Sequence, residues 1–239
     1  MRDPRCCISY WFPLLQKTGV PVPKTVIIDA GDHVSGYVFS DQPIPQKLLN
    51  AIAKAAKEVG GYPAFLRSGH TSNKHSWSRT CFLASESQID RNVREISEYC
   101  ECCDLLGLPS NIWVVREFLP IEPAFRAFND TPICKERRYW IKDGKVVGHH
   151  PYWPPESIQR PSDPNWDKHL AWINVERPDE VAELTALSEK AGRVFYGAWS
   201  IDWLWIPSRG WVCIDMAEAE RSYCWREHPN APKILFEAS

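Results

Sequence analysis

The chain has 239 residues, of which 44% are hydrophobic and 24% are charged, the balance of an ordinary soluble globular protein. Its formal net charge of −2 argues against non-specific binding to nucleic acid, which requires a positive surface. No apolar run approaches the roughly 18–20 residues of a membrane span, and the N-terminus lacks signal-peptide features, so we expect a cytoplasmic protein without a membrane partner.

Nine cysteines are present, an odd number that gives no sign of a disulfide framework. Three of them cluster in the stretch Cys100-Glu101-Cys102-Cys103. No second Cys or His pair follows at zinc-finger spacing, so we interpret the cluster as small packing residues on a helix. A structural metal there is the less favoured alternative.

Apolar periodicity predicts alternating helices and strands in the first half of the chain. A short helix should end near Gly19, and a proline-rich turn should lead into a β-branched strand. Two longer helices, each closed by glycine, should follow. The expected helices span residues 9–19, 44–60 and 87–106, and the expected strands span residues 24–28, 64–67, 80–84 and 112–115, the last continuing to residue 120.

The second half is predicted to form antiparallel hairpins and one helix. Asp143-Gly144 is a strong signal for a hairpin turn. Residues 149–177 are rich in proline and tryptophan and should form a long irregular segment of functional importance. Strands are expected at 138–142, 145–148, 200–206 and 211–216, and a helix at 178–196. This order predicts an α+β fold.

The last predicted hairpin brings two aspartates together. If Ile206 pairs with Trp211, Asp202 lies opposite Asp215. Two facing carboxylates among apolar neighbours repel each other, so something should compensate them: a divalent cation, a shared proton or an arginine. Alternatively, one aspartate merely ends a strand at the surface.

Two further acids, Glu218 and Glu220, follow this hairpin directly. Hard oxygen ligands without Cys or His favour Mg²⁺ or Mn²⁺. Such an ion usually shares its remaining positions with phosphate oxygens and water. The sequence therefore suggests a site that holds a metal together with a phosphate ligand.

The stretch from Phe65 to Trp77 offers a candidate phosphate site. Arg67 ends a strand and Lys74 lies in the polar loop after it. Small and hydroxyl-bearing residues of that loop could present hydroxyls and backbone amides to phosphate: Ser68, Gly69, Thr71 and Ser72. The Walker A pattern is absent, and a solvated turn is an equally good interpretation of this loop by itself.

Arg138 is a further candidate ligand for an anion. It should share a strand face with Glu136 and Trp140, and its fork suits phosphate or carboxylate. Lys142-Asp143-Gly144 lacks one residue of the adenylylation motif K-x-D-G, so we interpret it as a turn.

In their chain order, these pieces resemble the ATP-grasp superfamily. Gly19–Thr25 is similar to the family's G-[IV]-P-x-P-x-T segment, and Tyr62–Arg67 to its F-P-x-x-V-K strand, with Arg67 in place of the lysine. Val114–Leu119 resembles the linker between the two lobes, and Glu136-Arg137-Arg138 resembles an E-x-R strand. Asp202 and Asp215 are similar to the two metal-binding acids.

The resemblance implies residue roles. Lys24, Arg67, Ser72 and Lys74 would bind the nucleotide, the last two from a mobile phosphate-covering loop. The backbone of Glu117, Phe118 and Leu119 would pair with adenine, Glu117 or Glu122 would hold the ribose, and Glu136 would also bind the nucleotide. Asp202 and Asp215 would hold Mg²⁺ or Mn²⁺, and Arg138 would stabilise the γ-phosphate or an acyl phosphate, with Lys74 as a second catalytic group. The family's metal-binding asparagine is missing, since residue 217 is alanine, and Glu218 or Glu220 would substitute.

Arg67 and the Lys74 loop resemble most a phage and bacterial clade of predicted ATP-grasp ligases named for two arginines and a lysine. That clade is distantly similar to the eukaryotic factor that assembles translation initiation factor 2. The resemblance implies two α+β lobes around ATP: an N-terminal subdomain at 1–45, a central lobe at 46–116 and a C-terminal lobe at 117–239.

The function that this implies is an ADP-forming carboxylate ligase that uses ATP, a carboxylate substrate and an amine nucleophile, with a peptide or protein as one candidate substrate. One alternative is an ATP-binding assembly chaperone or regulator that docks a partner on 149–177. Another is a nucleic-acid-modifying enzyme with stacking tryptophans Trp153, Trp166 and Trp172, although a nucleic-acid partner is not expected. The sequence assigns no role to His70, His75, His149 or His150.

Overall fold

The computed structural model describes residues 4–103 and 107–235. Spatial contacts divide the chain into two compact units. One, called here the β1–β4 unit, comprises Pro23–Leu119 and Phe128–Thr131; the other, the β7–β10 unit, comprises Met1–Val22, Pro120–Ala127 and Pro132–Ser239. This division differs from the three expected ranges, since the first 22 residues group with the C-terminal part of the chain.

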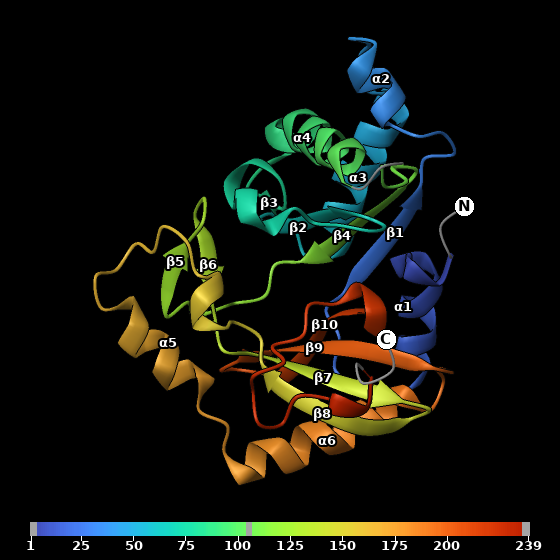
Figure 1. Ribbon diagram of the computed structural model, residues 1–239. Helices are drawn as coiled ribbons and strands as arrows, with labels where there is room; N and C mark the ends of the chain where they lie inside the picture. The colour runs from blue at the N-terminus through green and yellow to red at the C-terminus, as the bar shows by residue number, and fades with distance from the viewer. Residues whose placement is uncertain (1–3, 104–106, 236–239) are drawn as a thin grey trace. The chain divides into compact units, whose positions relative to one another are not determined.

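The β1–β4 unit contains a four-stranded antiparallel sheet in the order β1-β4-β2-β3 (Figure 1). The predicted strands are confirmed, with bounds β1 Thr25–Asp29, β2 Ala64–Ser68, β3 Phe82–Leu83 and β4 Ile112–Glu117. Both longer helices are confirmed, as α3 Gln46–Glu58 and α4 Ile89–Cys102, while the short α2 Ser35–Phe39 was not predicted. The expected end of α4, residues 104–106, lies outside the described residues.

One face of this sheet packs against α3 and α4. The side chains of Leu66, Trp113 and Val115 lie in the same core as Ile52 of α3 and Val93 of α4. Cys100 belongs to that core too, as expected of a small packing residue on the helix. Because side chains alternate along a strand, Arg67 and Arg116 must lie on the opposite face.

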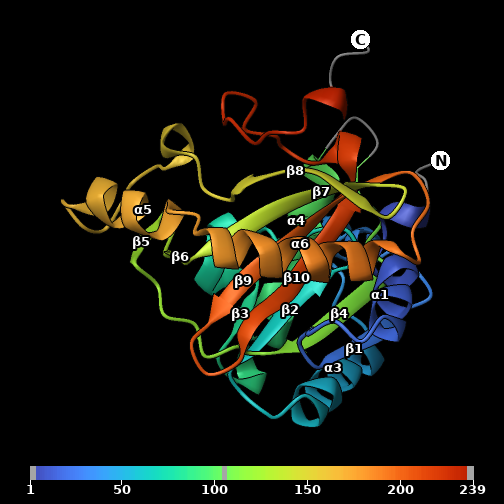
Figure 2. The same ribbon diagram turned by 90° about the horizontal axis from the view of Figure 1, so that it is seen from below.

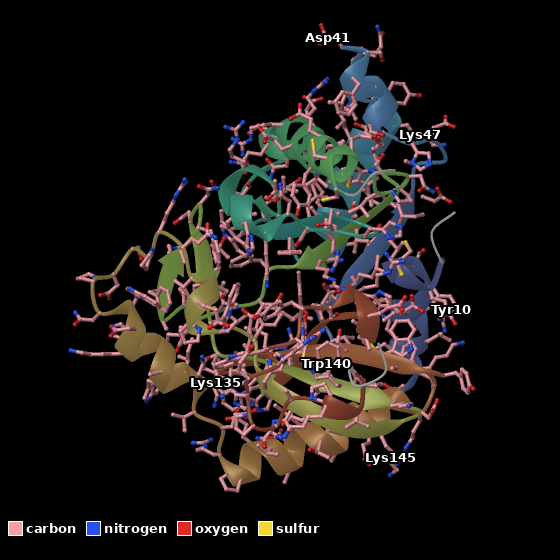
Figure 3. The ribbon with its side chains drawn as sticks, viewed as in Figure 1. Tyr10, Asp41, Lys47, Lys135, Trp140 and Lys145 are labelled. Atoms are coloured by element: carbon pink, nitrogen blue, oxygen red, sulfur yellow. The ribbon has the colours of Figure 1, made fainter. Side chains whose placement is uncertain are left out.

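The β7–β10 unit contains a second four-stranded sheet, in the order β10-β9-β7-β8. Its strands confirm the two predicted hairpins, with bounds β7 Glu136–Lys142, β8 Lys145–Pro151, β9 Ala198–Ile206 and β10 Gly210–Glu218. Figure 3 shows Lys135 immediately before β7 and Lys145 where β8 begins. The helices are α1 Ile8–Lys17, α5 Trp166–Asn174 and α6 Pro178–Gly192, of which α1 and α6 were predicted.

Helix α6 packs along one face of this sheet (Figure 2). The indole of Trp203 donates to Ser188 of α6 at 2.9 Å, and Arg137 pairs with Glu180 of α6 at 2.6 Å. Arg138, which follows Arg137, therefore points to the face away from α6.

The expectation for residues 149–177 is wrong in part, because this segment contains α5 and is not wholly irregular. Leu170 and Ile173 of α5 are buried, which supplies the helix with an apolar face that the surrounding prolines obscure in the sequence. A hairpin of two short strands, β5 Phe125–Ala127 and β6 Thr131–Ile133, was also not predicted. Over the described residues, no helix is long and apolar enough to cross a bilayer.

Candidate nucleotide and metal site

Two buried arginines lie on the face of the β1–β4 sheet opposite α3 and α4. Arg67 is paired with Val114 of β4, and Phe65 is paired with Arg116, so the arginines are diagonal neighbours on adjacent strands. Both are at least 95% buried, which is rare for arginine. Arg116 was missed in the sequence, although its position two residues after Val114 on a predicted strand already placed it on the face of Arg67. The face thus carries two fixed cations that suit an anionic ligand.

The loop after β2 does not present its amides as expected. Ser68 Oγ accepts from the backbone N–H of Thr71 at 3.0 Å and of His70 at 3.3 Å, and the N–H of Gly69 donates to the carbonyl of Ile112 at 2.7 Å. The N–H of Ser68 donates to the carbonyl of Thr71 at 2.9 Å. The predicted amide cradle at Ser68, Gly69 and Thr71 is therefore wrong, because these amides close the turn itself.

Lys74 begins a six-residue 3-10 segment, Lys74–Arg79, that is kinked at Ser76, rather than an open loop. Trp77 is its buried residue and packs on Phe65 and Phe82, with ring centroids 5.9 Å and 6.1 Å apart. The half-buried Ser72 lies two residues before Lys74. Lys74 therefore follows Arg67 in one continuous segment, as expected. The packed side chain of Trp77 holds that segment in place.

The predicted adenine-binding linker lies beside an aromatic cluster. Phe118 packs on Phe82 and Trp77 at centroid distances of 5.3 Å and 6.4 Å, and Leu119 is buried. Glu117 is engaged locally, since its N–H donates to the carbonyl of Lys24 at 2.9 Å and its carboxylate accepts from the N–H of Lys24 at 2.8 Å. Of the three linker residues, only Glu117 therefore belongs to the paired strand β4, and Phe118 and Leu119 follow its end. Glu122 is an exposed residue of the other unit.

In the β7–β10 unit, the two aspartates face each other as predicted, but through a different register. Near the turn, Gly210 is paired with Ile206 and Trp211 with Trp205, one residue away from the expected pairing. A register shift between Cys213 and Asp215 then restores the pairing of Asp215 with Asp202. The extra residue, Ile214, forms a β-bulge, which the sequence does not predict.

Arg138 compensates the aspartates. It is paired with Asp202 across β7 and β9, and its Nε and Nη2 donate to the two carboxylate oxygens at 2.7 Å and 2.8 Å. Its Nη1 donates to the carbonyl of Tyr223 at 2.8 Å, and its guanidinium lies 4.6 Å from the ring centroid of Tyr152. Burial by itself lowers the pKa of Arg138, but the Asp202 carboxylate outweighs it and raises the pKa above its usual value. An arginine, one of the three compensating groups considered, therefore pairs with Asp202.

The donor set fits a metal held by two carboxylates. An ionised carboxylate has about four lone-pair sites, and the Arg138 fork uses two of those on Asp202. Asp215 is half-buried and accepts from the N–H of Met216 at 3.1 Å. Two hard oxygen ligands suit Mg²⁺, which takes its other ligands from phosphate and water. In residues 4–103 and 107–235, no group of three or more His, Cys, Asp or Glu side chains could hold a metal.

Glu218 is accordingly not the third ligand that was expected. Its carboxylate pairs with Arg5 and accepts from Cys6 Sγ at 3.1 Å. Glu218 is the third residue after Asp215, so the two side chains leave the strand on opposite faces. The alternative, Glu220, is exposed in the turn that follows the strand.

The remaining polar candidates have structural partners. Glu136 accepts from the indole of Trp153 at 3.0 Å, and Trp153 is buried, so it is not a stacking platform for bases. His150 Nδ1 bonds the carbonyl of Pro151 at 2.7 Å and its Nε2 accepts from the N–H of Trp225 at 3.2 Å. Burial lowers the pKa of His150 to about 4, so the ring is neutral at pH 7. His149 pairs with Glu176 at 2.9 Å on the face of α6.

The profile of the family described as "ATP-grasp domain, R2K clade family 3" matches residues 58–229. Curated protein sequences gave no match. Among solved structures, Cdc123 from Schizosaccharomyces pombe is similar with a TM-score of 0.58 at 14% identity, over 90% of this chain and 83% of that chain.

Two nucleotide-bound carboxylase structures are also similar. The biotin carboxylase from Campylobacter jejuni in complex with β-γ-ATP has a TM-score of 0.52 at 14% identity, over 86% of this chain and 38% of that chain. The biotin carboxylase domain of the Hydrogenobacter thermophilus 2-oxoglutarate carboxylase, in complex with MgADP, has a TM-score of 0.50 at 14% identity, over 88% and 39%. This chain spans less than half the length of either, so the likeness concerns the fold alone, and it confirms the predicted α+β architecture.

Proposed function

The chain belongs to family 3 of the R2K clade of ATP-grasp domains, and from this premise we propose that it is an ADP-forming ligase that joins a carboxylate to an amine. The observation that carries the proposal is that Asp215, Asp202 and Arg138 lie side by side on three adjacent strands. A β-bulge keeps the two acids opposite each other, and Arg138 is paired with Asp202. A protein that used these acids for stability alone would gain nothing by placing them opposite each other.

The β1–β4 unit would bind the nucleotide. Arg67, Arg116 and Lys74 would neutralise the phosphates, and Ser72 would add a hydroxyl to the same segment. The exposed Lys24 lies at the start of β1, beside the linker. The backbone of Phe118 and Leu119 would meet the adenine next to the aromatic cluster, and Glu117 or Glu122 would hold the ribose.

The β7–β10 unit would hold the metal through Asp202 and Asp215. Mg²⁺, when bound, would neutralise phosphate oxygens and so ease attack on the γ-phosphorus. Arg138, closed on Asp202, would orient this carboxylate, and a direct contact with the γ-phosphate would require the fork to open. Glu136 would orient Trp153 rather than contact ATP.

The reaction has two steps. A carboxylate oxygen of the substrate attacks the γ-phosphorus, and the bond to the β-phosphate oxygen breaks, which releases ADP and forms an acyl phosphate. The amine nitrogen then attacks the acyl carbon, phosphate leaves, and the amine loses a proton. The chain's contribution is to position the groups and to neutralise charge that moves between phosphate oxygens.

Calorimetry and a trapping assay test this proposal. ATP should bind in the presence of Mg²⁺ and much more weakly with EDTA. Incubation with Mg-ATP, a pool of peptides and hydroxylamine should release ADP and form hydroxamates, because hydroxylamine intercepts acyl phosphates. Absence of ATP binding by the intact chain would overturn the proposal.

An ATP-binding chaperone or regulator is the second candidate. The observation in its favour is the exposed apolar end of α5, where Trp172 is 76% exposed and the following Val175 is 58% exposed. Solvent-exposed residues of this kind suit a protein partner. Tight Mg-ATP binding with neither ADP release nor hydroxamate formation would favour this function over the ligase.

A further inference from the structure

We propose that the tip of the β5–β6 hairpin, Phe128–Thr131, is a clamp that fixes the position of Lys74, with His75 as the side chain that it grips. The proposal rests on the proposed function in one respect, the phosphate contact of Lys74. The clamp itself is a property of the β1–β4 unit, to which the tip belongs by its contacts.

Three contacts join the tip to two consecutive residues. The ring of Phe128 stacks on the ring of His75, with centroids 4.1 Å apart and planes 9° from parallel. The N–H of Asn129 donates to the carbonyl of His75 at 3.2 Å, and Thr131 Oγ1 donates to the carbonyl of Lys74 at 2.7 Å. Both carbonyls of the Lys74-His75 pair are therefore bonded to the tip, so the peptide that carries the Lys74 side chain cannot turn freely.

The tip adopts a strained backbone to make these contacts. Phe128 has φ of +56° and Asp130 has φ of +71°. The left-handed region is uncommon for residues other than glycine and is a marked outlier for a bulky side chain such as phenylalanine. Strain of this kind persists only where surrounding contacts over-determine it, and it concentrates at functional sites. Aspartate tolerates the left-handed region and is an ordinary turn residue, so the strain lies at Phe128.

The other end of the Lys74 segment is fixed independently. Trp77 is buried against Phe65 and Phe82, and Thr80 Oγ1 donates to the carbonyls of Asn73 and Ser76 at 2.9 Å and 3.0 Å. Lys74 thus lies between the buried tryptophan and the hairpin tip. The tip bonds the carbonyls of Lys74 and His75 themselves and stacks on the His75 ring, so loss of the tip should loosen Lys74 more than it loosens Trp77.

His75 suits this task as a neutral ring. Its pKa is lowered by partial burial and by the charge of neighbouring Lys74, which favours the uncharged imidazole in the stack. A phenylalanine at position 75 offers the same flat surface, whereas an alanine offers none. His75 is therefore a positioning residue for Lys74, and its chemistry as an acid or base is not required.

The test compares His75→Ala, Phe128→Ala and His75→Phe, with Ser78→Ala as a control on an exposed residue of the same 3-10 segment. Hydrogen exchange of the amides in residues 73–80 is measured without nucleotide, and Mg-ATP affinity is measured by calorimetry. We expect faster exchange and about fivefold weaker binding for both alanine variants, wild-type values for His75→Phe, and no change for Ser78→Ala.

A double variant isolates the route through Lys74. Lys74→Met should weaken Mg-ATP binding, and His75→Ala added to Lys74→Met should weaken it no further, because the clamp acts through that lysine. Unchanged exchange in His75→Ala and Phe128→Ala would overturn the clamp, whatever happens to ATP. Faster exchange with full ATP affinity, or additive losses in the double variant, would overturn its action on Lys74. If the wild-type chain binds no ATP, the proposed function fails, and exchange alone decides on the clamp.

Discussion

The two sheets use their charged residues in different ways. On the face of the β1–β4 sheet opposite α3 and α4, two buried arginines, Arg67 and Arg116, lie on adjacent strands. On the α6-free face of the β7–β10 sheet, Arg138 closes a bidentate fork on Asp202 beside Asp215, so opposite signs meet within the protein.

A buried charge therefore has a different role in each of the two units. The Arg138–Asp202 pair is part of the fold, since removing one partner would leave the other charged and buried. Two like charges on neighbouring strands repel each other, so we propose that an anionic ligand, when bound beside Arg67 and Arg116, offsets this repulsion. Substitutions in each unit test whether the buried charges have these two different roles.

The largest effect should come from breaking the buried pair. Asp202→Ala leaves the Arg138 guanidinium buried without its carboxylate and should lower the free energy of unfolding by about 3–5 kcal/mol. The double variant Asp202→Leu/Arg138→Met should recover most of this loss in urea unfolding. The exposed pair of Arg177 and Asp179 is the control, and Asp179→Asn should change stability by less than about 1 kcal/mol. Equal losses in the single and double variants would contradict the interpretation.

Acid should next test the buried histidine of the β7–β10 unit. Burial lowers the pKa of His150 to about 4, below its ordinary value of 6.5, so the unfolded state takes up the proton first as the pH falls. Stability is therefore fully present above pH 6.5 and should decline by about 3 kcal/mol between pH 6.5 and 4. His228, whose pKa is also lowered by burial, adds to the same trend.

The check is urea unfolding of wild type, His150→Gln and the control His169→Gln at several pH values. His150→Gln should show a shallower decline, and His169→Gln, an exposed residue, should follow wild type. An identical pH profile for wild type and His150→Gln would show that His150 is not the group responsible.

The metal ligand proposed in the β7–β10 unit should affect binding and spare the fold. Asp215→Asn keeps the shape of the side chain and removes its charge, so Mg-dependent ATP affinity should fall about 30-fold or more, roughly 2 kcal/mol. The free energy of unfolding should stay within about 1 kcal/mol of wild type, since Asp215 is not a partner in the Arg138 fork. Unchanged nucleotide affinity in calorimetry would remove Asp215 from the metal site.

The smallest effect should come from exchanging one cation for another in the β1–β4 unit. Arg67→Lys and Arg116→Lys retain the charge but lose the planar fork, so Mg-ATP affinity should fall by about five- to tenfold, roughly 1 kcal/mol. Lys47→Arg, on the exposed side of α3, is the control and should bind like wild type. If both sheet variants also bind like wild type, the basic face does not contact the phosphates.

Much of the fold follows from local pattern. The helix α3 and the hairpin at Asp143-Gly144 could be predicted because apolar periodicity and turn residues act over a few positions. The α5 helix could not, because prolines before it obscure a short apolar face that only packing reveals. The candidate site was predictable as a set of residue types in chain order, and its resemblance to the ATP-grasp superfamily was confirmed.

The sequence by itself determined the strands of both sheets and the family, and it placed Asp202 and Asp215 on neighbouring strands of one hairpin. Tertiary structure decided the bulge at Ile214, the closure of Arg138 on Asp202, the diversion of Glu218 to Arg5, and the grip of Phe128 on His75. The physical reason is separation along the chain. Apolar periodicity is set by residues that are close in sequence. The partner of a buried charge or ring comes from a distant segment, and the two meet only when the whole unit packs.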